Sequence, residues 1–128
     1  MAEEDMEYEY HNLGNDYYKL GDYERAIDHY SKAIGLKPDM LESYFNRGLA
    51  YTRVHEFNKA VEDHTQAITL DPNLGEAYYT RGLLYEYMKN YDQAINDYKK
   101  VLSLNPGNAE VREQLELVVN KKRNSGLL

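Results

Sequence analysis

Residues 75–108 have the sequence GEAYYTRGLLYEYMKNYDQAINDYKKVLSLNPGN. This stretch contains Pro106, the last of three prolines in a chain of 128 residues; the others are Pro38 and Pro72. Successive prolines are 34 residues apart, and a fixed spacing of this length indicates an internal repeat. The spacing predicts three repeats, namely 7–40, 41–74 and 75–108.

The positions that recur in every repeat are those that a packed pair of helices needs. The first four are spaced as i, i+3, i+4 and i+7, which places them along one stripe of a helix. A small alanine and an aromatic or imidazole ring follow in a second helix, which the proline ends because it lacks an N–H group. The recurring residues are Tyr10, Leu13, Gly14, Tyr17, Ala26, Tyr30 and Pro38; Tyr44, Arg47, Gly48, Tyr51, Ala60, His64 and Pro72; and Tyr78, Arg81, Gly82, Tyr85, Ala94, Tyr98 and Pro106.

The pattern predicts two helices in each repeat and a seventh helix after the third. We expect Asp39, Asn73 and Asn108 to cap the helices that follow the prolines. The seventh helix has one apolar face, formed by Val111, Leu115, Val118 and Val119, and is expected to cover the last repeat. The predicted helices are 7–20, 23–36, 41–54, 57–70, 75–88, 91–104 and about 109–122. The predicted capping segment is 109–123, and segments 1–6 and 124–128 are expected to be disordered.

This repeat resembles that of the tetratricopeptide repeat (TPR) family, with Tyr in place of the usual Trp at its first position. The resemblance implies an all-α fold, an α-α superhelix (TPR solenoid) of seven antiparallel-paired helices. It also implies protein–protein interaction, with a peptide or helix of a partner held in a concave groove lined by the first helices of the repeats. A self-assembling scaffold unit and a designed consensus-like sequence without a ligand are the alternatives. We expect a monomer or a weak homodimer.

The resemblance assigns the groove to equivalent positions of each first helix. Five of the residues there are aromatic, although the packing stripes do not need them, and exposed aromatic side chains favour a binding surface. The predicted groove residues are Tyr8, His11, Asn12, Asn15, Tyr18 and Lys19; Glu42, Phe45, Asn46, Leu49, Thr52 and Arg53; and Glu76, Tyr79, Thr80, Leu83, Glu86 and Tyr87.

Chaperone-binding TPR domains grip the C-terminal carboxylate of heat-shock chaperones with two asparagines and three basic residues. The two asparagines match Asn15 and Asn46, but the three basic positions hold His11, Glu76 and Thr80. Because a carboxylate needs charged donors, the sequence disfavours this ligand.

Two arginines, Arg47 and Arg81, stand where the first repeat has Leu13. We expect their stems to lie along tyrosine rings. Their guanidinium groups are expected to reach water or a neighbour such as Glu42 or Glu76.

Composition excludes several other classes of protein. A net charge of −7 disfavours nucleic acid as a partner, and the absence of cysteine excludes disulfides and thiol nucleophiles. The four histidines lack the spacing of a helical metal pair, and no phosphate loop or serine elbow is present. We therefore expect no catalysis and no cofactor. Without an apolar N-terminal segment or a long apolar run, a cytoplasmic protein that does not bind membranes is expected.

Overall fold

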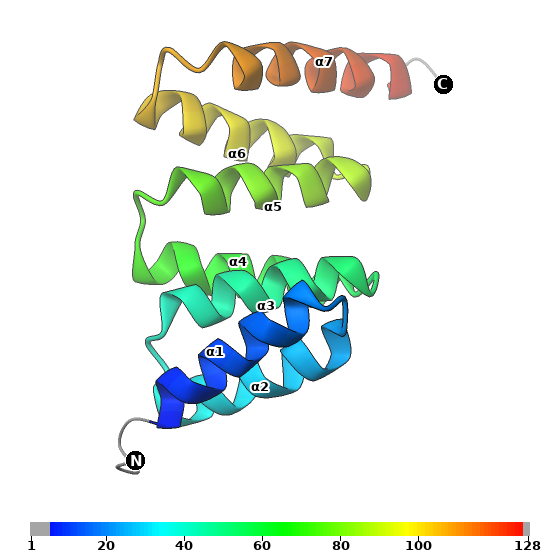
Figure 1. The fold of residues 1–128 in the computed structure, drawn as a ribbon. Coiled ribbons are helices and arrows are strands. Elements are labelled where there is room, and N and C mark those ends of the chain that lie inside the picture. The colour runs from blue at the N-terminus through cyan, green and yellow to red at the C-terminus, as the bar shows by residue number, and fades with distance from the viewer. Residues whose placement is uncertain (1–5, 127–128) are drawn as a thin grey trace. The chain divides into compact units, whose positions relative to one another are not determined.

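The computed structural model describes residues 6–126, and every regular element in that range is an α-helix (Figure 1). The helices are α1 (Met6–Lys19), α2 (Tyr23–Leu36), α3 (Leu41–Arg53), α4 (Phe57–Leu70), α5 (Gly75–Tyr87), α6 (Tyr91–Leu104) and α7 (Ala109–Ser125). The predicted all-α class and the seven helices packed in adjacent pairs are confirmed. The described residues form two compact units, which are divided between Pro72 and Asn73.

The helix ends differ slightly from the sequence prediction. Helix α7 continues to Ser125, beyond the expected end at about residue 122, and the basic residues in its last turn are favourable at a helix C-terminus. Residues 124 and 125, which we expected to be disordered, are therefore helical. Met6 opens α1, while residues 1–5 and 127–128 of the segments expected to be disordered lie outside the described residues.

The expected helix caps are only partly correct. Each helix that follows a proline has its N-cap two residues after that proline, at Met40, Leu74 and Asn108. Only Asn108 has a side chain that can cap, and its Oδ1 accepts the backbone N–H of Val111 at 3.1 Å. Asp39 and Asn73 stand one residue too early, and neither is the N-cap.

In the first unit α1 packs against α2, α2 against α3, and α3 against α4. Within each pair a glycine of the first helix faces a ring of the second helix. A Cβ built on Gly14 would lie 2.6 Å from the Tyr30 ring, and one on Gly48 would lie 2.8 Å from the His64 ring. Both rings are buried, so His64 is part of the core, as expected. The recurring glycine therefore exists to make room for the recurring ring.

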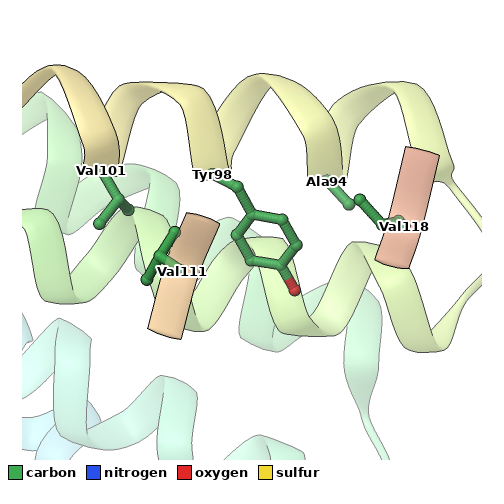
Figure 2. Close-up of a cluster of buried hydrophobic side chains, with 5 residues drawn as sticks. All are labelled: Ala94, Tyr98, Val101, Val111 and Val118. Carbon is green, nitrogen blue, oxygen red and sulfur yellow. The ribbon is translucent and has the colours of Figure 1, made fainter. Parts of the chain in front are cut away.

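In the second unit α6 lies between α5 and α7. Ala94, Tyr98 and Val101 of α6 form a buried cluster with Val111 and Val118 of α7 (Figure 2). Leu115 packs against this cluster. The apolar face predicted for the seventh helix thus covers the last repeat.

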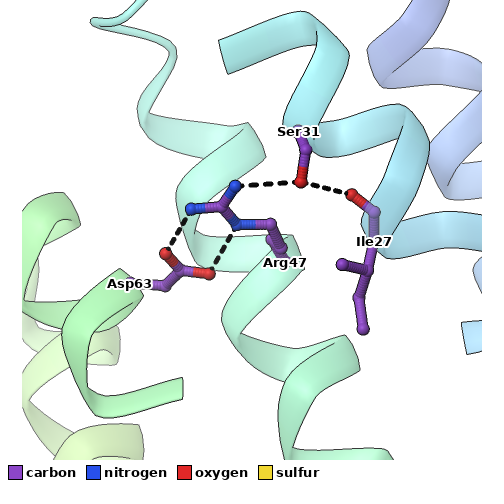
Figure 3. Close-up of polar contacts among 4 residues, drawn as sticks. All are labelled: Ile27, Ser31, Arg47 and Asp63. Atoms are coloured by element: carbon purple, nitrogen blue, oxygen red, sulfur yellow. Dashed lines mark hydrogen bonds and ion pairs between the residues drawn. The ribbon is translucent and has the colours of Figure 1, made fainter. Parts of the chain in front are cut away.

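An ion pair joins the two helices of the second repeat. Arg47 Nε and Nη2 donate to the two carboxylate oxygens of Asp63, both at 2.8 Å, while Nη1 donates to Ser31 Oγ at 3.0 Å (Figure 3). The guanidinium carbon lies 5.7 Å from the ring centroids of both Tyr44 and Tyr51. The guanidinium group, for which we expected water or an acidic neighbour, thus lies near both tyrosine rings.

The third repeat has the same ion pair. Arg81 donates to the Asp97 carboxylate at 2.9 and 2.7 Å, between Tyr78 and Tyr85. The expected acidic partners, Glu42 and Glu76, were wrong for both arginines. An aspartate sixteen residues after each arginine comes from the second helix of the same repeat, where a bidentate pair can form at the helix interface.

Candidate functional site

A connected group of polar side chains lies where α1, α2 and α3 meet in the first unit. Asn15 Oδ1 accepts hydrogen bonds from Tyr30 Oη at 2.6 Å and from Asn46 Nδ2 at 3.0 Å. Asn15 Nδ2 lies 3.3 Å from His11 Nε2, and His11 Nδ1 lies 2.8 Å from Ser43 Oγ. We call these five residues the amide network. It brings together three predicted site residues, His11, Asn15 and Asn46.

The protonation states of the network follow from burial. Desolvation raises the pKa of Tyr30 to about 12, so this phenol stays protonated at neutral pH and donates a hydrogen bond to Asn15. Burial also lowers the pKa of His11, although the Glu42 carboxylate acts in the opposite direction. A neutral imidazole has one acceptor nitrogen. In His11 this acceptor is Nε2, which faces the N–H group of the Asn15 amide.

Beside the network lies a pocket of about 220 Å³. It is lined by three residues of α1, two of α3 and one of α2, namely Asn15, Tyr18 and Lys19, Asn46 and Leu49, and Tyr30. Lys19 gives this pocket a positive charge, and no acidic side chain lines it. We call it the amide pocket. It contains five predicted groove residues together with Tyr30, which the sequence assigned to the core alone.

The other predicted residues of the first unit surround this pocket or pack locally. The guanidinium carbon of Arg53 lies 5.7 Å from the ring centroid of Tyr23, and the neighbouring Tyr18 raises the pKa of this arginine. Phe45 places its ring edge-on to His64, with 5.0 Å between the centroids. The Thr52 hydroxyl donates to its own helix at Gly48. Tyr8 accepts a 2.7 Å hydrogen bond from Lys37, and Asn12 and Glu42 are exposed.

The second unit has a larger pocket, of about 370 Å³, between α5, the end of α6 and the start of α7. Of the predicted groove residues, Glu76 and Tyr79 line it. The sequence did not predict the rest of its lining, which includes Val101, Leu104 and Glu110, because those residues belong to the second helix and the capping helix. We call it the acidic pocket.

Glu86, also predicted for the groove, accepts hydrogen bonds from other residues of the second unit. Tyr98 Oη and Gln114 Nε2 donate to its Oε1 at 2.8 and 2.7 Å, and Lys121 Nζ donates to Oε2 at 2.6 Å. Burial raises the pKa of Glu86, but these donors outweigh burial and leave the pKa below its usual value. This carboxylate therefore joins α5 to α6 and α7.

The remaining predicted residues of α5 have simpler surroundings. Leu83 and Tyr87 are 39% and 69% exposed, which is compatible with a surface for a partner. The Thr80 hydroxyl donates to the backbone oxygen of Glu76 within the same helix at 2.8 Å.

Residues 6–126 contain no group of three or more His, Cys, Asp or Glu side chains that could hold a metal ion. In the same range no helix is long and apolar enough to cross a membrane.

Comparison with protein families identifies the fold. The model described as a TPR repeat matches residues 14–54, and the model described as a tetratricopeptide repeat matches residues 41–74 and 75–108. The chain belongs to the tetratricopeptide repeat family. No curated protein sequence matches it.

Similar solved structures include domains with bound peptides. The first TPR of Spaghetti (RPAP3) bound to the HSP90 peptide SRMEEVD is 30% identical, with a TM-score of 0.86 over 95% of this chain and 97% of that one. The second TPR domain of human RPAP3 in complex with the HSP70 peptide SGPTIEEVD is 33% identical, with a TM-score of 0.76 over 84% and 89%.

The TPR domain of Sgt2 from Aspergillus fumigatus is 27% identical, with a TM-score of 0.82 over 95% of this chain and 82% of that one. Together with the family matches, these neighbours identify the chain as a TPR module of the protein-binding class.

Proposed function

We propose that this TPR domain binds the acidic C-terminal tail of a partner protein, with the terminal carboxylate of the tail in the amide pocket. Asn15 and Asn46 both line that pocket and are joined by a 3.0 Å hydrogen bond, and Lys19 also lines it. This pairing of two amides with one ammonium group is the observation that carries the proposal.

The chemistry of the amide pocket suits an anion. Each asparagine amide has two N–H groups, of which one is used within the amide network and one remains for a ligand, and Lys19 has three donors and a positive charge. Hydrogen bonds from a charged donor to a carboxylate are shorter and stronger than neutral ones. Since no acidic side chain lines the pocket, a carboxylate entering it meets donors and no repelling charge.

The comparisons support the same kind of ligand. The two RPAP3 domains are bound to peptides that both end in the residues EEVD, and these domains are 30% and 33% identical to this chain. The asparagine positions that chaperone-binding domains use hold Asn15 and Asn46 here. These findings favour the acidic tail over the unspecified peptide that the sequence led us to prefer.

The missing basic residues affect affinity. His11, Glu76 and Thr80 provide no permanent positive charge, so Lys19 is the cation of the amide pocket. With one charged donor instead of several, we expect a dissociation constant of about 10–100 µM, an order of magnitude or two weaker than a micromolar complex.

Isothermal titration calorimetry with the peptide SRMEEVD tests the proposal. We expect saturable binding that falls about tenfold in Asn46→Ala, because a hydrogen bond to a charged group contributes roughly 1.5–3 kcal/mol. Lys19→Gln is expected to weaken binding similarly. Lys59→Gln removes an exposed cation outside the pocket and is the matched control.

The same peptide with a C-terminal amide separates the terminal carboxylate from the acidic side chains. The proposal requires the amidated peptide to bind at least tenfold more weakly. Equal binding of both peptides, or no saturation at millimolar concentration, would show that the amide pocket does not hold a terminal carboxylate.

A further inference from the structure

The acidic pocket of the second unit has the opposite electrostatic character from the amide pocket. Glu76 of α5 and Glu110 of α7 both line it, and no Lys or Arg side chain does. Neither carboxylate forms an ion pair with any residue in the range 6–126. A cavity with two uncompensated carboxylates attracts a cation and repels an acidic tail.

The nearby cations of this unit are directed elsewhere. Lys100 lies over the ring of Tyr78, with 5.8 Å between Nζ and the ring centroid. Arg112 donates to the backbone oxygen of Pro106. Neither of these two cations therefore neutralises the exposed carboxylates of Glu76 and Glu110.

The lower part of the pocket is apolar. Val101 and Val111 are almost completely buried beneath it, and Leu104 lies at its edge. Tyr79 forms part of the wall, and burial together with the nearby Glu110 carboxylate raises the pKa of its phenol. The pocket thus combines an aromatic and aliphatic surface with two carboxylates.

This combination matches one side chain. Arginine has an apolar stem, a planar guanidinium group that stacks on aromatic rings, and five donors arranged for carboxylates. The volume of about 370 Å³ falls within the range of roughly 300–1,000 Å³ that is usual for ligand pockets. Lysine has a compact, strongly hydrated charge and no plane to stack on Tyr79.

We propose that the acidic pocket is a second recognition site, which binds an arginine side chain of a partner protein. The guanidinium group lies between Glu76 and Glu110, and the stem lies against Tyr79 and Leu104. The site belongs entirely to the second unit, so it stands or falls independently of carboxylate binding in the amide pocket.

Nuclear magnetic resonance titration of the full ¹⁵N-labelled chain with N-acetyl-arginine amide at constant ionic strength tests this site. We expect saturable shifts at the backbone amides of Gly75, Tyr79 and Val111, with a dissociation constant in the millimolar range. N-acetyl-citrulline amide has the same shape without the charge and is expected to bind at least fivefold more weakly.

Glu76→Gln and Glu110→Gln each remove one negative charge and keep the shape of the side chain. Each variant is expected to bind the arginine probe about threefold more weakly, as for an exposed ion pair, and the double variant about tenfold. Glu113→Gln, on the same helix outside the pocket, is the control and is expected to bind normally. An unchanged backbone spectrum of the free double variant shows that it is folded.

Equal binding of the arginine and citrulline probes would overturn the proposal, as would normal arginine binding by the double variant. Shifts confined to residues outside the acidic pocket would also overturn it. If the arginine probe binds but the peptide SRMEEVD does not, the acidic pocket is supported and the proposed function is contradicted. If SRMEEVD binds but the arginine probe does not, only the proposal for the acidic pocket is contradicted.

Discussion

Asn46 of α3 donates a 3.0 Å hydrogen bond to Asn15 of α1, thirty-one residues earlier in the chain. The bond connects the first helices of two successive repeats, and the same Asn15 oxygen accepts the Tyr30 phenol of α2. Three helices thus converge on one amide. Because this amide also lines a pocket, the packing of the repeats and the proposed binding of a carboxylate depend on the same side chain.

Gly48→Ala is predicted to destabilise the protein by about 1–3 kcal/mol, the usual cost of overpacking a core. The new Cβ would lie 2.8 Å from the buried His64 ring. Gly35→Ala is the control, since a Cβ there meets nothing within 4 Å, and alanine in a helix is expected to stabilise by roughly 0.5–1 kcal/mol. Urea unfolding of both variants measures the difference; a neutral Gly48→Ala would contradict this packing.

The ion pair of Arg47 and Asp63 can be compared with the first repeat, where Leu13 and His29 occupy the same positions. His29 lies there between the rings of Tyr10 and Tyr17, with centroids 6.2 and 5.1 Å away.

Asp63→His alone leaves the partly buried Arg47 without its carboxylate and is predicted to cost about 3 kcal/mol. Adding Arg47→Leu, which copies the first repeat, should recover more than half of that loss. A double-mutant cycle from urea unfolding measures the coupling. Additive effects would mean that the pair is not coupled.

The turn between the two helices of each repeat has one residue with positive φ. These residues are Gly21, His55 and Lys89, with φ values of 80°, 63° and 63°. Hydrogen bonds from Lys89 N to Glu86 O and from Asn90 N to Tyr85 O close the turn in the third repeat, a common way to end a helix.

Lys89→Gly is predicted to stabilise by about 0.5–1 kcal/mol, because glycine adopts positive φ without steric cost. The reverse change, Gly21→Ala, should destabilise by a similar amount. Thermal unfolding of the two variants tests whether their changes in stability have opposite signs. A less stable Lys89→Gly would show that the positive φ of Lys89 is not strained.

The His11 imidazole makes stability depend on pH. The groups around it are Asn15, Ser43, the Tyr30 ring and Glu42. Its pKa is below the ordinary 6.5 in the folded state, so the unfolded chain takes up the proton first as pH falls.

The contribution of neutral His11 is therefore complete above pH 6.5 and is lost as pH falls toward the lower folded pKa. Between about pH 7.5 and 5.5 the unfolding free energy of the natural chain should fall by up to about 1 kcal/mol more than that of His11→Gln. Urea unfolding at both pH values tests this; identical pH dependence of the two proteins would exclude His11 as the cause.

The repeat made most of the fold predictable. Pro38, Pro72 and Pro106 fixed the register, and the stripes of each helix followed from their spacing. The partners of Arg47 and Arg81 were missed because Asp63 and Asp97 lie on the second helix, where an aspartate looks like an ordinary exposed charge. The rotation of the second helix that turns Asp63 and Asp97 toward the first helix depends on how the two helices pack, which the sequence does not show.

The candidate site was predictable only in part. Asn15, Asn46 and Lys19 were predicted from the groove positions of the TPR repeat. The acidic tail was disfavoured as a ligand because three positions that are basic in chaperone-binding domains are not basic here. Tyr30 and Ser43 were missed because their packing positions concealed their hydroxyl bonds. Glu110 was missed because it lies on the capping helix, outside the repeat.

The most direct test of the proposed function observes the two asparagine side chains. In a ¹H–¹⁵N spectrum of the full chain titrated with SRMEEVD, the Nδ2 signals of Asn15 and Asn46 should shift together and saturate with one dissociation constant. The amidated peptide should leave both signals nearly unchanged. Saturable binding of SRMEEVD without any change in these two side-chain signals would place the tail elsewhere and contradict the proposed site.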